Sequence, residues 1–336
     1  MKRKIKRKKD SSETKPILNN SKKRKIKRFF KKSKNYINPQ KKLIILLFFI
    51  SFICLILIII LINKFKKKNN SVITEKMKYK QDNLTLVTAY YKIKSKHSKR
   101  RYIRWMKFTL QLNRSMIIFS SKDFMEKIKE IRPKYLHNKT IFIELEITDF
   151  YSYKNYINDF NKTYKIDTEK WRHHSVELYL VWAEKCSFLK KAIINNYFNS
   201  TCFYWIDIGY FRRRRGIRNY INWPSTQKCY EDKRVLFSLI RNISETEKNL
   251  LLHFDKDTHK EFELKLNVGG TMFGGYFENL LKFINYYYDA IGIFVAENLF
   301  IGKDQNIFAY VCFAHPELVN LIYSPKNYHY FKYYLS

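Results

Sequence analysis

The sequence predicts an α/β protein with a mostly parallel sheet flanked by helices, preceded by one transmembrane helix. From residue 84 onward, short apolar runs typical of buried strands alternate with longer segments whose apolar residues recur at helical spacing. Such alternation favours a parallel sheet covered by helices. Before it, residues 43–62 read LIILLFFISFICLILIIILI without a single charge. A helix of this length matches a hydrocarbon core about 30 Å thick.

The segment that precedes this apolar run, residues 1–42, is strongly basic. It contains only Asp10 and Glu13 as acids and contributes much of the formal net charge of +37. With few apolar residues it cannot bury a core, so we expect a disordered arm. Such an arm first suggests nucleic-acid binding, but beside a membrane span the positive-inside rule predicts a cytosolic location. The chain is therefore predicted to be a type II single-pass membrane protein, with a lysine-rich stem over residues 63–83.

The elements of the C-terminal part follow in order along the chain. The expected strands are apolar and rich in β-branched or aromatic residues, and they lie at 84–91, 115–121, 140–146, 202–209, near 234–240 and near 262–268. The expected helices carry apolar residues three or four apart, and they lie at about 102–112, 121–132, 175–197 and 276–291. Ser120 and Asp123 have capping-box spacing, and Pro133 ends the helix that follows. No internal repeat is visible.

Ligands of parallel α/β sheets bind at the carboxyl ends of the strands. One such end is the turn after Tyr90, and another is Asp207 in FYWIDIGYFRRRRG, residues 203–216. A strand-end carboxylate can hold a phosphate-bound metal or a sugar hydroxyl, and it can equally cap the next turn. The four arginines Arg212–Arg215 can hold phosphate oxygens through bidentate contacts, or they can form a solvated basic loop.

Two later segments are further candidates for a site. NVGGTMFGGYFENLL, residues 267–281, has two glycine pairs just before a helix, which favours a binding loop over a tight hairpin because glycine permits close backbone approach. GKDQN, residues 302–306, offers Asp304 beside Gln305. Asp304 is either the N-cap of the helix that follows or a base or sugar-hydroxyl acceptor.

Four cysteines lie in the C-terminal part: Cys186, Cys202, Cys229 and Cys312. This even number could pair in an oxidising compartment, but their spacings match no zinc motif and do not determine the connectivity.

Five motifs, in order, resemble the HtrL/YibB family of proposed glycosyltransferases over residues 84–315: TLVTAYYKI, VWAEKCSFLKKAI, FYWIDIGYFR, GGTMFGG and GKDQN. The resemblance implies a GT-A-like, Rossmann-type sheet that binds a nucleotide-sugar. Asp207 and Asp304 are then the expected catalytic residues. The residues expected to bind the donor or acceptor are Thr88, Ala89, Tyr90, Lys185, Arg212, Gly269, Gly270, Gly274, Gly275 and Gln305.

The resemblance also raises the question of a metal. In GT-A enzymes an Asp-x-Asp at a strand end holds a divalent metal on the diphosphate. Here the corresponding stretch is Asp207-Ile208-Gly209, which lacks the second carboxylate. We expect a Mn²⁺ or Mg²⁺ ion held by Asp207. The arginines could share the neutralisation of the phosphates with this ion, or they could neutralise the phosphates in its place.

The predicted function is transfer of a sugar from a nucleotide-sugar donor to a glycan, glycoprotein or glycolipid acceptor. The catalytic domain, residues 84–336, is expected in the lumen of the Golgi or ER, with a membrane but no nucleic acid as partner. One alternative is a catalytically inactive, lectin-like glycan-binding protein. The other is a basic membrane-tethered protein that binds nucleic acid or lipid through residues 1–42.

Overall fold

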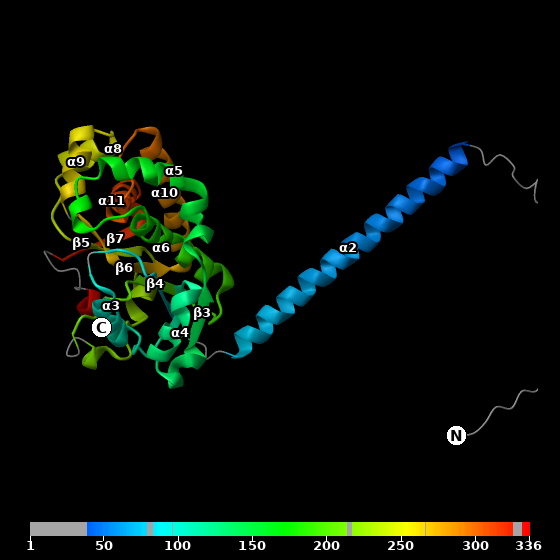
Figure 1. The fold of residues 1–336 in the computed structure, drawn as a ribbon, viewed down its shortest axis with the longest axis horizontal. Coiled ribbons are helices and arrows are strands. Elements are labelled where there is room, and N and C mark those ends of the chain that lie inside the picture. Colours follow the sequence, from blue (N-terminus) through cyan, green and yellow to red (C-terminus); the bar gives the residue numbers. More distant parts are fainter. Residues whose placement is uncertain (1–38, 79–82, 96, 214–216, 266, 325–330) are drawn as a thin grey trace, which may run out of the picture. The chain divides into compact units, whose positions relative to one another are not determined.

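The computed structural model describes residues 39–78, 83–95, 97–213, 217–265, 267–324 and 331–336 (Figure 1). The chain divides into two compact units, residues 1–69 and 70–336, and each is described by itself. The expected disordered arm lies outside the described residues except for 39–42, which begin a helix.

The first unit contains most of helix α2 (Pro39–Lys78), which includes the whole apolar segment 43–62. The large apolar side chains described along this segment are exposed, and Phe48 reaches 74% exposure. Within the described part of the chain, no helix meets the length and hydropathy required of a membrane span. The membrane-spanning role of this segment therefore stays a prediction. The expected stem begins inside the same helix rather than after it.

The second unit is built around one seven-stranded sheet with the order β3-β2-β1-β4-β6-β5-β7. The strands are β1 (Leu84–Tyr90), β2 (Ser115–Ser120), β3 (Thr140–Glu144), β4 (Cys202–Ile206), β5 (Val235–Leu239), β6 (Val268–Tyr276) and β7 (Val319–Tyr323). The pairs β3–β2, β2–β1, β1–β4 and β5–β7 are parallel, and β6 runs antiparallel to both β4 and β5. The prediction of an α/β fold with a mostly parallel sheet is confirmed.

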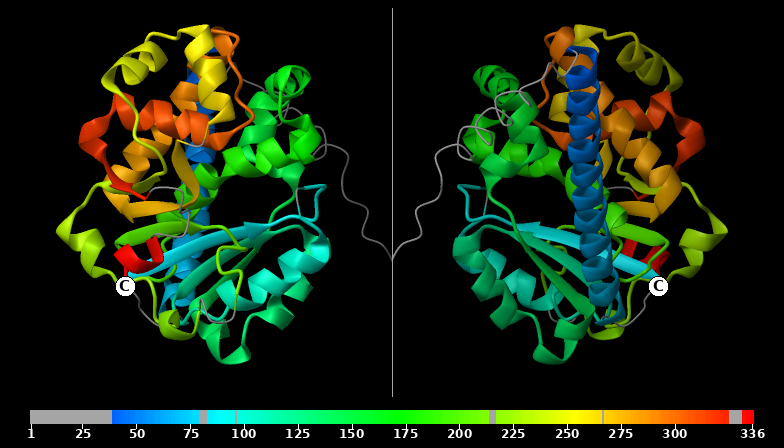
Figure 2. Two further views of the ribbon diagram at one scale, coloured as in Figure 1. Left: turned by 90° about the vertical axis from the view of Figure 1, so that its left-hand side faces the viewer. Right: turned by 90° about the vertical axis from the view of Figure 1, so that its right-hand side faces the viewer.

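Helices cover both faces of this sheet (Figures 1 and 2). They are α3 (Lys99–Thr109), α4 (Lys122–Ile131), α5 (Tyr151–Ile166), α6 (Val176–Asn195), α7 (Gln227–Glu231), α8 (Glu245–Leu252), α9 (Lys256–Leu264), α10 (Phe277–Ala296), α11 (Asp304–Ala314) and α12 (Phe331–Tyr334). One core packs α5, α6, α10 and α11 against the sheet, and the other packs α3 and α4 against the opposite face. Neighbouring strand residues such as Leu86 and Val87 belong to different cores because successive side chains point to opposite faces. Strands β1, β2 and β4 are buried at every position, which explains their mostly apolar and uncharged sequences.

The glycine-rich segment is a strand, so the expected binding loop is wrong. Residues 268–276 form β6, and the first part of the strand expected near 262–268, residues 262–264, belongs to α9 instead. A Cβ on Gly274, whose φ is +152°, would lie 2.1 Å from the carbonyl oxygen of Phe203. A Cβ on Gly275 would lie 2.6 Å from the carbonyl oxygen of Arg234. Both glycines are therefore required because β6 passes very close to its neighbours in the sheet.

The start of α4 also differs from the expectation. The N-cap is Ser121, whose side chain makes no capping hydrogen bond, so the predicted capping box of Ser120 and Asp123 is wrong. The Ser120 hydroxyl instead donates to the carbonyl oxygen of Tyr90 at 2.7 Å. This hydrogen bond ties the end of β2 to the end of β1.

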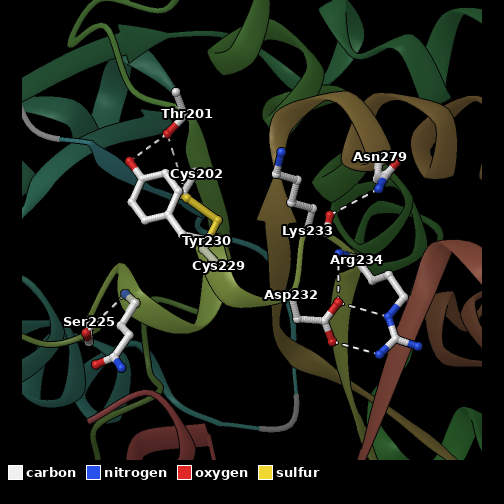
Figure 3. Close-up of a disulfide and its surroundings, with 10 residues drawn as sticks. Thr201, Cys202, Ser225, Cys229, Tyr230, Asp232, Lys233, Arg234 and Asn279 are labelled. Atoms are coloured by element: carbon white, nitrogen blue, oxygen red, sulfur yellow. Dashed lines mark hydrogen bonds and ion pairs between the residues drawn. A yellow bond between two sulfur atoms is a disulfide. The ribbon is translucent and has the colours of Figure 1, made fainter.

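One disulfide joins Cys202, at the start of β4, to Cys229 in α7 (Figure 3). Cys186 and Cys312 are buried and free, so only two of the four cysteines of the domain pair. The hydroxyls of Thr201 and Tyr230, the residues next to the two bonded cysteines, lie 2.9 Å apart. Structural disulfides of this kind persist in oxidising compartments.

Candidate active site

The order β3-β2-β1-β4 has a topological consequence. The chain moves outward from β1 to β3 and then returns to the other side of β1 as β4. The carboxyl ends of β1 and β4 therefore flank a switch point, which is where open α/β sheets bind ligands. A pocket of about 150 Å³ opens there, lined by residues that follow both strands and by side chains of α3 and α6.

Three charged side chains from three elements meet beside this pocket. Lys185 comes from α6, Asp207 directly follows β4, and Asp304 is the first residue of α11. The Lys185 Nζ lies 2.8 Å from Asp304 Oδ2 and 3.4 Å from Asp207 Oδ1. It also donates to the carbonyl oxygen of Gly270, in β6, at 2.8 Å. The ammonium group thus binds the two carboxylates and strand β6 together.

The members of this cluster differ in their access to solvent. The side chains of Lys185 and Asp304 are 5% and 6% exposed, whereas that of Asp207 is 37% exposed. Asp207 Oδ1 accepts a hydrogen bond from Trp205 Nε1 at 2.8 Å, and the Asp207 backbone N–H donates to the carbonyl oxygen of Thr271. Asp207 is the only carboxylate among the described residues that line the pocket. It is therefore held rigidly at one oxygen while its side chain still reaches the pocket.

Burial and charge act in opposite directions on the pKa values of the cluster. Burial by itself lowers the pKa of Lys185, but Asp207 and Asp304 together outweigh it and the pKa is raised above its ordinary value. Burial raises the pKa of Asp304, and the neighbouring ammonium only partly opposes that rise. The two neighbouring acids therefore favour the charged form of Lys185.

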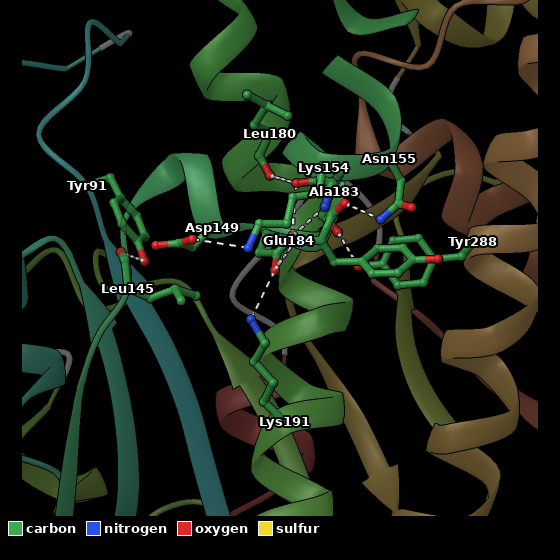
Figure 4. Close-up of polar contacts among 12 residues, drawn as sticks. Tyr91, Leu145, Asp149, Lys154, Asn155, Leu180, Ala183, Glu184, Lys191 and Tyr288 are labelled. Carbon is green, nitrogen blue, oxygen red and sulfur yellow. Dashed lines mark hydrogen bonds and ion pairs between the residues drawn. The ribbon is translucent and has the colours of Figure 1, made fainter. Parts of the chain in front are cut away.

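Helix α6 is fixed in place by the residue next to Lys185. Glu184 is fully buried and accepts hydrogen bonds from the backbone N–H groups of Tyr151 and Ser152, at the start of α5 (Figure 4). Its carboxylate also lies 3.6 Å from Lys191 Nζ. A carboxylate at a helix N-terminus satisfies N–H groups that have no partner within the helix. This contact anchors the turn of α6 that carries Lys185.

Aromatic side chains form the walls of the pocket, and cations lie among its lining residues. Trp105 of α3 makes an edge contact with His97 at 4.8 Å between ring centres. The exposed Arg212 places its guanidinium 4.6 Å above the Trp105 ring. Lys92 and Lys99 also line the pocket. The site thus combines one accessible carboxylate, aromatic surfaces and positive charge.

The structure brings together some of the residues singled out from the sequence and separates others. Those that line the pocket are Ala89, Tyr90, Lys185, Asp207 and Arg212. Asp304 and Gly270 contact Lys185 from outside the pocket lining. Gln305 contacts the cluster through its backbone N–H, which donates to the Asp304 carboxylate. Those that contribute neither a lining side chain nor a contact to the cluster are Thr88, buried in β1, and Gly269, Gly274 and Gly275 of β6. Arg213 is exposed, and Arg214 and Arg215 lie outside the described residues.

Sequence reasoning missed the aromatic walls. Trp105 and Trp182 were assigned to helix faces by their spacing, and Trp205 to a buried strand. All three line the pocket as well as packing against the protein. The spacing of these residues indicates that their side chains are shielded from solvent. It does not distinguish packing in the hydrophobic core from packing around a ligand pocket.

The described residues do not fit a metal ion that bridges two carboxylates. Among them, no group of three or more His, Cys, Asp or Glu side chains is placed to hold a metal. The Lys185 ammonium contacts both Asp207 and Asp304. A cation shared by these two carboxylates would have to displace an ammonium that already makes those contacts.

The fold and the site define an α/β domain with a ligand pocket at the switch point of a doubly wound type of sheet. The chain belongs to the HtrL_YibB family, whose model matches residues 82–336 and is described as a bacterial protein of unknown function. Comparison with curated proteins found no match. The description as bacterial gives no support to the expected location in the Golgi or ER.

Proposed function

We propose that the protein transfers a sugar from a nucleotide-sugar donor to a glycan, glycoprotein or glycolipid acceptor, on a GT-A-like domain. The observation that carries this proposal is the accessible Asp207 carboxylate in an aromatic pocket with Arg212 at its edge. Aromatic faces and a carboxylate suit a sugar ring with its hydroxyls, and guanidinium groups suit phosphate oxygens. The two halves of a nucleotide-sugar thus meet complementary groups.

The reaction follows from this placement. The bond between the anomeric carbon and the diphosphate oxygen breaks, and the nucleoside diphosphate leaves with the electron pair. The acceptor hydroxyl oxygen forms the new bond to that carbon, and its proton passes to Asp207. Asp207 acts as general base because it alone among the described pocket carboxylates can reach an acceptor.

Lys185 and Asp304 are positioning residues in this scheme. Lys185 holds Asp207 in place, and Asp304 holds Lys185 charged within the protein. The diphosphate charge falls to Arg212, Lys92 and Lys99, which line the pocket. A Mn²⁺ or Mg²⁺ ion held by Asp207 and the diphosphate would share in this neutralisation.

We propose further that α2 anchors the domain to a membrane. Its apolar segment is exposed along its described length, and exposed apolar surface of this extent is unfavourable in water. Residues 84–336 are then placed opposite the basic arm, on the side where the Cys202–Cys229 disulfide persists.

The test uses the full chain in a mild detergent with a panel of nucleotide-sugars. Release of the nucleoside diphosphate and transfer to added glycans are measured, with donor binding followed by calorimetry. Asp207→Asn should lower turnover at least roughly hundredfold, the lower end of what a general base contributes, without changing the unfolding temperature. Asp257→Asn, an exposed carboxylate on α9, is the matched control.

Near-normal turnover by Asp207→Asn would refute the catalytic assignment. Donor or glycan binding without any release of nucleoside diphosphate would instead favour the lectin-like alternative.

A further inference from the structure

The positive charge of the domain is concentrated in two segments near the pocket. Residues 84–122 contain ten Lys and Arg side chains and no Asp or Glu. Residues 212–218 contain five arginines and no acid. Residues 123–336 without the segment 212–218 hold 25 cationic and 25 acidic side chains. The excess charge is therefore local, and not a general property of the domain.

Both segments reach the pocket directly. Lys92 and Lys99 from the first segment and Arg212 from the second line it. Further exposed cations lie on α3, the helix that also carries the pocket residues Tyr102 and Trp105. These α3 cations are Arg100, Arg101, Arg104 and Lys107. They form a basic surface, named here the α3 surface, on the exposed side of the helix whose residues Tyr102 and Trp105 line the pocket.

In the described part of the chain, the cations of the α3 surface lack the acidic partners that many other cations have. Elsewhere, many exposed lysines pair with an acid three residues away, as Lys127 does with Glu130 and Lys162 with Asp159. Within the described part of the chain, none of the four α3 cations has an ion pair. Neighbouring like charges repel one another, and a ligand of opposite charge relieves that repulsion.

The donor alone does not account for this surface. A diphosphate is a compact group, and Lys92, Lys99 and Arg212 already line the pocket that would hold it, in addition to Lys185. Helix α3 has 11 residues, so it extends over about 16 Å. A ligand that contacts cations along this length must be extended and must carry several negative charges.

We infer that the acceptor is an anionic glycan whose phosphate or carboxylate groups lie along the α3 surface. This inference rests on the proposed function and names its acceptor class. An anionic chain that lies along α3 can place a terminal hydroxyl in the pocket beside Asp207. A membrane surface does not offer this arrangement, because its headgroups are fixed in a plane and cannot both lie along α3 and extend a hydroxyl into the pocket.

The experiment measures binding of oligogalacturonate, a carboxylate-bearing oligosaccharide, to the full chain in non-ionic detergent without any donor. Maltodextrin of equal length is the neutral probe. The triple variant Arg100→Gln, Arg101→Gln and Arg104→Gln removes three charges of the α3 surface. The control variant Lys154→Gln, Lys162→Gln and Lys260→Gln removes three charges from lysines that have acidic partners.

We expect oligogalacturonate to bind the unmodified chain and the control variant equally, and the α3 variant roughly tenfold more weakly. Added salt should weaken binding to the unmodified chain because exposed charges are screened. Maltodextrin should bind at least tenfold more weakly than oligogalacturonate.

Equal losses in the two triple variants, or equal binding of the two probes, would overturn the inference. So would stronger binding of single-stranded DNA or phosphatidylglycerol vesicles through the same three arginines. The outcome is separable from that of the proposed function. A chain that releases nucleoside diphosphate but ignores oligogalacturonate refutes the acceptor class alone, whereas the reverse result refutes the transferase and leaves an anionic-glycan surface.

Discussion

Replacing Lys185 with methionine removes the ammonium between two carboxylates and keeps most of the side-chain volume. Lys185 Nζ contacts Asp304, Asp207 and the Gly270 carbonyl oxygen at 2.8, 3.4 and 2.8 Å. Removing one partner of a buried ion pair costs about 3–5 kcal/mol. A domain has a net stability of about 5–15 kcal/mol, so this substitution should remove a large part of it.

The loss should depend on pH in a definite direction. Burial already raises the pKa of Asp304, and Lys185 opposes that rise, so the Lys185→Met variant should raise it further. A carboxyl group whose pKa is higher in the folded than in the unfolded state favours folding when protonated. The penalty should therefore be largest near pH 7 and shrink as the pH falls toward the ordinary carboxyl range.

The assay is urea unfolding of the full chain in detergent, followed by tryptophan fluorescence at pH 7 and pH 5. Lys190→Met is the matched control, since Lys190 lies on the same helix with an exposed hydrogen bond to Asn285. The double variant Lys185→Met, Asp304→Leu should recover most of the loss, because it leaves no buried charge without a partner. A loss below about 1 kcal/mol in Lys185→Met, or a double variant less stable than the single one, would refute this account.

Three further outcomes are expected. Gly274→Ala should lower the unfolding free energy by at least about 3 kcal/mol, because its Cβ would meet the Phe203 carbonyl oxygen at a φ of +152°. Gly292 has open space around it, so Gly292→Ala should stabilise the protein by up to about 1 kcal/mol. Urea unfolding measures both effects. Burial lowers the pKa of His259. The stability that the neutral imidazole contributes should therefore be present above the ordinary histidine pKa near 6.5 and be lost as the pH falls below it. The unfolding free energy of the His259→Gln variant should drop less between pH 7.5 and 5.5 than that of the unmodified chain. Cys229→Ser opens a loop of sequence separation 27 and should cost about 3–4 kcal/mol, and dithiothreitol should then have no further effect on its melting temperature.

Much of the fold was predictable because burial leaves a direct mark on sequence. Strands β1, β2 and β4 are covered on both faces, so each reads as a mostly apolar run without a charged residue. Helix α6 carries its Ser175 N-cap, whose side chain accepts the N–H of Leu178, close to the predicted start. Asp207 was identified because it is the first polar residue after such a run.

The sequence by itself thus determined the α/β class, most of the elements and the strand ends where a site belongs. Only the tertiary structure decided the reversed direction of β6, the burial of Asp304 against Lys185 and the aromatic walls of the pocket. The glycine pairs show the reason: a residue without a side chain permits close approach equally to a ligand or to a neighbouring strand, and here Gly274 meets strand β4. The local sequence pattern indicates that a residue is buried or closely approached by other atoms. Which residue lies next to it depends on distant segments of the chain, as Lys185 and Asp304 show, which are more than a hundred residues apart.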